Sequence, residues 1–254
     1  LRKYIQLKLN DNLPFLIPRV SGIENNIAVF HKIRNSYNNK DINNYMKNVI
    51  PIMKNNAGIK LSCNESIKKY SDLYLDAFDN CDIYCGWEIQ GNYLNHISES
   101  HEYIKQFYVS KQMIWSFSLD IYHYIYSNPW TYALKGKRIL IVSPFKDSIL
   151  EQIPKRQHLY DGVDLFPECT FIVIKPPVTQ GSEKSLEFDE ELEIFYTKID
   201  NIKDNYDVAL LSCGGYCNII SNHIFKKHKK SAIYVGGVLQ MFFGIYGNRW
   251  IKER

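Results

Sequence analysis

Short apolar runs alternate with amphipathic segments along the second half of the chain. Four of these runs are bounded by glycine, proline or charged residues and predict buried strands: GKRILIVSPF, CTFIVIKPP, YDVALLSCGG and SAIYVGG. The segments between them have helical spacing, at residues 147–160, 187–202 and 216–227. This alternation predicts an α/β protein with a Rossmann-like, mainly parallel sheet and helices on both faces.

The first half of the chain has more helical patterns. Apolar residues recur with helical spacing over 24–34 and 64–80. A further helix is predicted to begin at Asp41, a good N-cap residue, and to end or kink at Pro51. The aromatic segment 98–126 is also expected to be helical. These patterns make the N-terminal half helix-rich.

The chain divides near residue 128 on these patterns. We assign residues 1–128 to an N-terminal α/β half, in which PFLIPRVSG and CDIYCGW predict short strands, and residues 129–254 to a Rossmann-like nucleotide-binding half. We expect the two halves to pack as one compact unit. Because the chain begins with Leu1 rather than Met, we interpret it as part of a longer polypeptide with further domains.

Charge and cysteine usage limit the partners. The formal net charge of +4 suits an anionic small ligand and is too mild for a nucleic-acid binder. No apolar run approaches the roughly 20 residues that cross a bilayer, so we predict no membrane span. Two cysteine pairs, Cys81 with Cys85 and Cys213 with Cys217, lack the two-residue gap of zinc knuckles. We expect buried thiols in a reducing, cytoplasmic setting.

Three of the predicted strands end in loops with ligand-binding chemistry. In parallel α/β sheets, ligands bind at the carboxyl ends of the strands. The loops are Ser143-Pro144-Phe145, Ser212-Cys213-Gly214-Gly215-Tyr216 and Gly236-Gly237. A glycine pair before a helix can offer backbone N–H groups to a phosphate, or it can be a tight turn. Likewise, Ser143 can hydrogen-bond a phosphate or cap the next helix. Neither a G-x-G-x-x-G nor a Walker motif is present.

The stretch SAIYVGGVLQMFFGIYGNRW carries further candidates. Gln240 lies in an otherwise apolar segment, so its amide must be hydrogen-bonded by a ligand or by the backbone. Gly244 and Gly247 can turn the chain so that Arg249 brings positive charge toward a diphosphate. The alternative is that these glycines form steric turns and that Arg249 is a solvated surface residue.

Several stretches resemble the GT-D type of sugar-nucleotide glycosyltransferases and related bacterial and viral polysaccharide-cluster proteins. The resemblance covers most of the C-terminal half, through NPWTYALKGKRILIVSPF, SILEQIPKR, YDVALLSCGGYCNIISNHI and SAIYVGGVLQMFFGIYGNRW. In the N-terminal half it lies chiefly in IPRVSGIEN. In GT-D enzymes an arginine, a glycine and an Asp-x-Glu pair follow a strand. Arg19 and Glu24 match the arginine and the glutamate, whereas Gly22 stands where the aspartate would be.

The resemblance implies transfer of a sugar from a nucleotide-diphosphate donor onto a glycan acceptor. It assigns catalytic roles to Arg19 and Glu24, with Glu24 as general base or as a group that orients the donor sugar. Glu24 alone would hold Mn²⁺ or Mg²⁺ weakly, so the reaction is expected to work without metal if the glycine loops and Arg19 or Arg249 neutralise the diphosphate. The plain alternative is that Arg19 and Glu24 form a surface ion pair.

Two other classes of protein stay open. One is another Rossmann-like enzyme, such as a methyltransferase or an NAD-linked protein, although Lys175 ends the TFIVIK strand where an acidic residue would hold ribose. The other is a non-catalytic module that binds a nucleotide or a glycan. The missing aspartate favours that second class.

Overall fold

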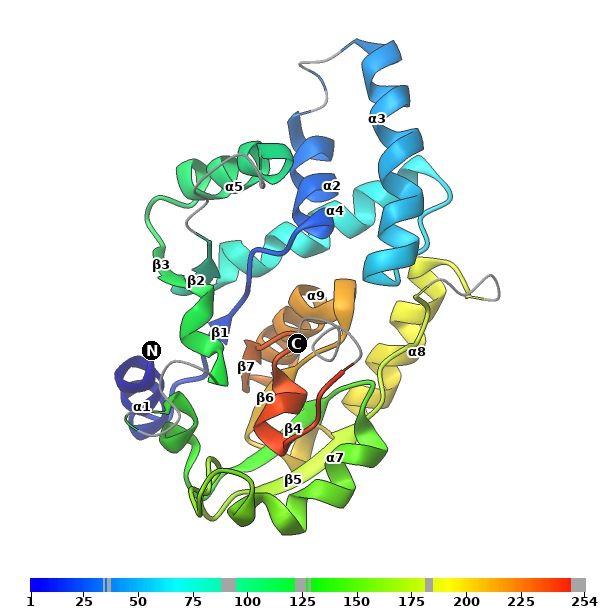
Figure 1. Ribbon diagram of the computed structural model, residues 1–254. Coiled ribbons are helices and arrows are strands. Elements are labelled where there is room, and N and C mark those ends of the chain that lie inside the picture. The colour runs from blue at the N-terminus through cyan, green and yellow to red at the C-terminus, as the bar shows by residue number, and fades with distance from the viewer. Residues whose placement is uncertain are drawn as a thin grey trace.

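A parallel sheet forms the centre of the computed structural model, which describes residues 1–33, 35, 38–87, 95–121, 127, 129–180 and 185–247 (Figure 1). The sheet has five strands in the order β1-β7-β6-β4-β5. Their bounds are Leu16–Ile17 for β1, Ser231–Tyr234 for β7, Val208–Leu211 for β6, Arg138–Val142 for β4 and Thr170–Ile174 for β5. All four pairings are parallel, as the apolar runs predict.

A second, two-stranded parallel sheet continues this row of strands. It consists of β2 (Ile83–Gly86) and β3 (Gln112–Trp115). Just beyond β1, the Cys85 N–H donates to the Pro18 carbonyl and the Val20 N–H donates to the Cys85 carbonyl, each at 2.8 Å. The row therefore runs β3-β2-β1-β7-β6-β4-β5, and the two halves of the sequence share it.

Each face of the sheet is covered by its own hydrophobic core. In β4, Leu140 and Val142 pack into one core, and Ile139 and Ile141 pack into the other. The first core is completed by helices α2 (Ile23–Ile33), α4 (Asn64–Asn80), α8 (Phe188–Asp200) and α9 (Cys217–His223). The second is completed by α1 (Arg2–Asn10), α7 (Lys146–Gln152) and the 3-10 helix η10 (Leu239–Phe243). Burial on both faces explains why the strands read as continuous apolar runs.

Local sequence signals account for several helix ends. Helix α8 begins with a capping box in which the side chains of Glu187 and Glu190 accept from each other's backbone N–H groups. Helix α3 (Asn39–Ile52) ends one residue after Pro51 and continues as a π-helical turn, η2 (Met53–Ala57), which Gly58 ends in a left-handed conformation. The predicted end of this helix at Pro51 is therefore close to the observed one.

Two predictions for the first half differ from the structure, and one helix was not predicted. Helix α3 begins at Asn39, so Asp41 lies inside the helix and is not its N-cap. The single helix expected over 98–126 is wrong, because α5 (Asn95–Phe107) is followed by strand β3, and residues 122–126 lie outside the described part of the chain. Strand β3 is a half-exposed edge strand that depends on pairing with β2, so its own pattern carries little strand signal. Helix α1 was not predicted.

The described part of the chain also contains short helices: η4 (Ser116–Leu119), η5 (Trp130–Leu134), η6 (Ile153–His158), η7 (Lys203–Asn205), η8 (Gly214–Tyr216) and η9 (Ile224–His228).

The cysteines match the expectation of buried thiols, with one exception. All six are free, and only Cys63 is exposed. Burial raises the pKa of Cys85 to about 12, which keeps this thiol protonated and unreactive. Among the described residues, no helix is long and apolar enough to cross a membrane.

Candidate active site

The strand ends converge as the sequence predicts. Val142 pairs with Leu211, and Leu211 pairs with Tyr234, so β4, β6 and β7 end side by side. The chain after β4 and after β7 leads into α7 and η10 on one face, whereas the chain after β1 and after β6 leads into α2 and α9 on the other. In doubly wound folds, ligands bind at the carboxyl edge of the sheet, between neighbouring loops that leave toward opposite faces.

Arg19 lies where β1, β7 and α9 meet. Its Nη1 donates to the Val235 carbonyl at 2.7 Å, and its guanidinium lies 4.7 Å from the centre of the Trp87 ring. Asn218 of α9 fixes the backbone by accepting from the Arg19 N–H at 3.1 Å and donating to the Arg19 carbonyl at 3.0 Å. The Arg19 side chain is only partly buried, and within the part of the chain that the structure describes its guanidinium donates one hydrogen bond, to Val235, which leaves further N–H donors for a ligand.

The second glycine pair borders Arg19. Gly236 has a φ of 81°, and a Cβ added there would lie 2.7 Å from Nη1 of Arg19. The residue must be glycine because both its conformation and the guanidinium exclude a side chain. Gly237 is exposed, and a Cβ added there would meet nothing within 4 Å. Of the pair, Gly236 accommodates Arg19, and only Gly237 offers open backbone to a ligand.

Glu24 is a buried carboxyl group beside Arg19. It lies in the first turn of α2, with 9% of its surface exposed. Burial raises the pKa of Glu24, and hydrogen bonds to its own backbone and to Ser21, together with the charge of Arg19, offset part of that rise. A solvated surface ion pair is therefore not the arrangement here. The structure brings the two residues of the Arg-x-x-Gly-x-Glu motif together.

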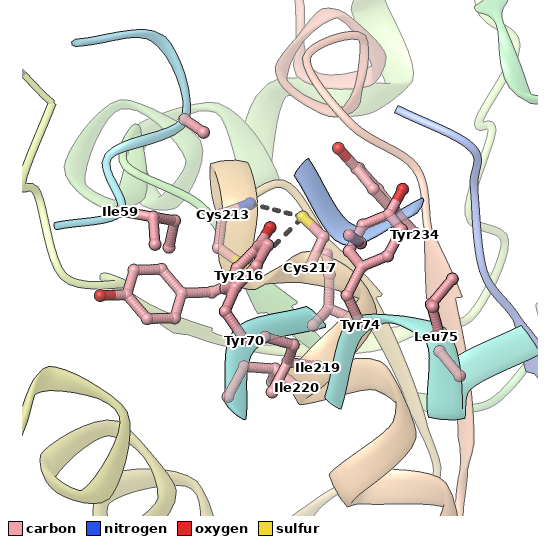
Figure 2. Close-up of a cluster of buried hydrophobic side chains, with 14 of the residues drawn as sticks. Ile59, Tyr70, Tyr74, Leu75, Cys213, Tyr216, Cys217, Ile219, Ile220 and Tyr234 are labelled. Atoms are coloured by element: carbon pink, nitrogen blue, oxygen red, sulfur yellow. Dashed lines mark hydrogen bonds between the residues drawn. The ribbon is translucent and has the colours of Figure 1, made fainter. Parts of the chain in front are cut away.

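Three buried tyrosines, Tyr70, Tyr74 and Tyr234, lie near enough to feel the charge of Glu24, and Figure 2 shows them in one cluster of buried side chains. Burial, followed by the charge of Glu24, raises the pKa of both Tyr70 and Tyr74, so these phenols stay protonated. Tyr74 also lies 2.8 Å from the Ser21 hydroxyl, and its oxygen accepts the Ser21 N–H at 3.2 Å. Tyr234, at the end of β7, is also buried near Glu24. These neutral neighbours hold the motif in place.

The same surroundings do not fit a divalent cation. Mn²⁺ and Mg²⁺ require several oxygen ligands, commonly more than one carboxylate. Glu24 is a single carboxyl group whose burial favours the protonated form, and the nearest opposite charge is already the guanidinium of Arg19. Gly22, where the resemblance places the aspartate, adds no ligand, although a Cβ there would meet nothing within 4 Å.

The loop after β4 has a local structural role. The Ser143 side chain is fully buried, and its Oγ accepts the Phe145 N–H at 3.2 Å. This bond stabilises the turn that leads into α7 but does not cap the helix, because the N-cap position is Phe145 and receives no side-chain cap bond. Pro144 is exposed and borders a small cavity, and Phe145 is half-buried beside Gly247.

The first glycine pair is packed against the N-terminal half. A Cβ on Gly214, whose φ is 57°, would lie 2.8 Å from the Ala57 carbonyl oxygen, and one on Gly215 would lie 2.4 Å from Cγ1 of Ile59. Tyr216 is 1% exposed and stacks on Phe188 at 5.9 Å between ring centres, so its ring is not available to a base or sugar (Figure 2). Geometry gives these three residues a packing role.

A cavity of about 60 Å³ remains beside this pair. It is lined by residues from the ends of β4, β5 and β6 and from the turn that closes η2: Ala57, Gly58, Pro144, Pro176, Pro177, Val178, Thr179, Gln180, Ser212, Cys213, Gly214 and Tyr216. This volume holds a few water molecules and not a nucleotide. A nucleotide would need more space than this cavity offers.

Gln240 carries an unmatched polar atom. It is 4% exposed, and its Oε1 has no hydrogen-bond partner among the residues described. A Cβ on Gly247 would lie 3.4 Å from Nε2 of Gln240, so the last described residue closes over this amide. A buried carbonyl oxygen without a donor is costly, which favours a ligand donor at this position. Arg249 lies outside the described residues.

Sequence reasoning missed three residues of the site. Trp87 ends the predicted strand CDIYCGW, so the rule about carboxyl ends of strands could have indicated it. Asn218 and Tyr74 carry no such signal. They lie within helices α9 and α4, and each reaches the site only because its helix packs on the sheet beside residues 19–21. Their partners are set by tertiary packing.

Fold and site together define a parallel α/β protein with Arg19 and the buried Glu24 at the carboxyl edge of its sheet. Comparison of the chain with protein-family models, with curated proteins and with solved structures found no match.

Proposed function

We propose that this protein transfers a glycosyl group from a nucleoside-diphosphate sugar to a glycan hydroxyl. The observation that carries the proposal is that the Arg19 guanidinium and the buried carboxyl group of Glu24 lie close enough at the carboxyl edge of the sheet for the charge of Arg19 to act on Glu24. A cation with unused N–H donors suits the diphosphate, and a carboxyl group with a raised pKa suits proton transfer. The resemblance of IPRVSGIEN to the GT-D motif supports the same assignment.

In the proposed reaction, the acceptor oxygen forms a bond to the anomeric carbon as the bond from that carbon to the diphosphate breaks. The proton of the acceptor hydroxyl moves to the carboxylate of Glu24, whose raised pKa makes it a stronger base than an exposed glutamate. Arg19 and the open backbone at Gly237 stabilise the negative charge that develops on the leaving diphosphate. Gln240 supplies its free Oε1 to a donor group of the nucleotide.

The first experiment compares ligands by thermal shift. UDP-, GDP- and dTDP-sugars are tested beside S-adenosylmethionine and NAD, because only ligands that bind the folded state raise the melting temperature. We expect a shift with at least one nucleotide sugar and none with the other two cofactors. A shift with S-adenosylmethionine or NAD alone would contradict the proposal. Binding of nucleotide sugars without any transfer or hydrolysis would identify a binding module instead.

The second experiment separates binding from chemistry. Arg19→Ala is expected to weaken donor binding about 10- to 100-fold, the effect of losing a charged hydrogen bond. Glu24→Gln should retain donor binding and lose transfer. Arg138→Ala is the matched control: it removes an equal charge from an exposed ion pair with Asp207 at the start of β4, at the opposite edge of the sheet from Arg19. Its donor affinity by calorimetry and its transfer rate should equal those of the parent protein.

Two further tests address metal and the C-terminal segment. Because the donor set around Glu24 does not fit a divalent cation, EDTA should leave the transfer rate of the parent protein unchanged.

Arg249→Ala should weaken nucleoside-diphosphate binding by about 1.5–3 kcal/mol if Arg249 makes a charged hydrogen bond to the diphosphate. Unchanged affinity in the Arg249 variant would assign that residue to the solvent and leave Arg19 as the diphosphate ligand.

A further inference from the structure

Two histidines and an aspartate converge at the opposite edge of the sheet. Asp200 ends α8, His223 ends α9 and His228 ends the π-helical turn η9, shortly before β7 begins. From these helix ends the chain continues into β6 and β7, so the cluster lies at the amino edge of the parallel sheet, opposite Arg19 and Glu24. Nothing in the proposed transfer reaction uses this cluster.

The three side chains present their ligand atoms to one point. Nε2 of His223 and Nε2 of His228 each lie 2.7 Å from Oδ1 of Asp200, and the three atoms all lie within 4.8 Å of one another. Tetrahedral zinc with bonds of about 2.0–2.1 Å separates neighbouring ligand atoms by about 3.3 Å. Each N···O distance needs to open by only about 0.6 Å to admit the ion.

Surrounding groups fix both imidazoles in the necessary orientation. The Tyr206 hydroxyl lies 2.7 Å from Nδ1 of His228 and can accept from it, as outer partners of metal-bound histidines do. Tyr196 stacks on the His223 ring with centres 3.9 Å apart. The π-helical turn of η9, a form whose hydrogen bonds join residues five apart, separates the two histidines, which are also five residues apart. Such turns are frequent at functional sites.

We propose that Asp200, His223 and His228 bind a divalent transition-metal ion, with Zn²⁺ the best match. Two imidazoles and one carboxylate are the ligand set of open zinc sites, in which water takes the fourth position. The site is half-open: the side chains of His228 and His223 are 1% and 11% exposed, and that of Asp200 is 25% exposed. Bound metal would join the ends of α8, α9 and η9.

Other groups of the chain contact the same ligand atoms. Lys227 competes with a metal, because its Nζ lies 2.5 Å from Oδ2 of Asp200. Without metal, the Nε2–H groups of both histidines donate hydrogen bonds to Oδ1 of Asp200.

Titration with Zn²⁺ and Co²⁺ tests the site in protein free of any histidine tag. We expect one ion per chain by calorimetry, a rise in melting temperature with Zn²⁺, and the visible absorption of tetrahedral Co²⁺. His223→Gln and His228→Gln should each weaken binding by about 100-fold or more, and Tyr206→Phe by about 10-fold, as outer-partner variants do. Lys227→Gln should tighten binding several-fold.

Three controls keep the outcome decisive. His158→Gln removes an exposed histidine outside the cluster and should bind metal as the parent does. His223→Cys keeps a ligand atom and should retain binding with an altered Co²⁺ spectrum, which a purely structural histidine would not produce. Circular dichroism confirms folding of each variant. The absence of saturable binding by the parent, or binding by either folded glutamine variant equal to that of the parent, overturns the proposal.

Discussion

Two glycine pairs follow adjacent strands of the same sheet, Gly214-Gly215 after β6 and Gly236-Gly237 after β7, and their surroundings differ. In the first pair, each glycine touches the segment that ends η2, within 3 Å of any added Cβ. In the second, Gly236 makes room for Arg19 and Gly237 faces open space. The first pair joins the two halves of the chain, and the second borders the candidate active site. The same Gly-Gly sequence therefore allows close packing after β6 and leaves open backbone for a ligand after β7.

The largest effect is expected from Gly215→Ala. The added methyl group would lie 2.4 Å from Cγ1 of Ile59 in a fully buried position, and overpacking of this kind costs about 1–3 kcal/mol. Urea unfolding measures the loss. Ile59→Ala in the same chain removes the clashing atoms, so the double variant should lose less stability than the sum of the two single variants. Additive losses would mean that Ile59 is not what excludes a side chain at this glycine.

Gly236→Ala should show a mixed effect. Alanine at a φ of 81° costs about 1 kcal/mol or more, and its methyl group would also displace the Arg19 guanidinium from the Val235 carbonyl. We therefore expect lower stability by urea unfolding and weaker binding of the nucleotide donor by calorimetry. Donor affinity equal to that of the parent in a folded variant would separate Arg19 from the ligand site.

Glu24→Gln should gain stability while losing transfer. The folded-state pKa of Glu24 is raised, so the protonated form favours folding, and this contribution is lost as pH rises through the folded pKa. The variant should melt above the parent at pH 8, and the difference should shrink as the pH falls toward 4, where the parent carboxyl group is protonated. Melting curves across this pH range measure the difference in melting temperature between the variant and the parent. A parent that is more stable than the variant at pH 8 would contradict the prediction.

Gly237→Ala should change stability least. Its methyl group enters open space and its φ is not positive, so the free energy of unfolding should stay within about 0.5 kcal/mol of the parent value. If the donor diphosphate approaches this backbone, calorimetry should show weaker donor binding in a protein of unchanged stability. Unchanged donor affinity would mean that the second glycine pair does not contact the donor and is only a turn that makes room for Arg19.

Much of the sheet could be predicted because β4, β5, β6 and β7 are apolar runs with glycine, proline or charged residues at their ends. Strand β3 could not, since its QMIW sequence is half-exposed and is held by pairing with β2. Arg19 and Glu24 were indicated by the resemblance of a local motif. What surrounds them, including Trp87 and Asn218, comes from segments far away in sequence. For the same reason, sequence alone could not separate the two glycine pairs: Ile59 and Arg19 decide their roles through tertiary contact.

The short strand β1 sets an order for folding of the chain. Leu16 and Ile17 pair with Ala232 and Ile233, and the neighbouring Phe15 N–H reaches the Ser231 hydroxyl across 216 positions. At ribosomal rates of 5–20 residues per second, about 10–40 s separate the synthesis of these partners. The segment that carries Arg19 and Glu24 must therefore wait for the last strand of the sheet. Pro18 and Val20 can pair with β2 as soon as both segments have been made, but the other edge of β1 stays unpaired until β7 has been synthesised.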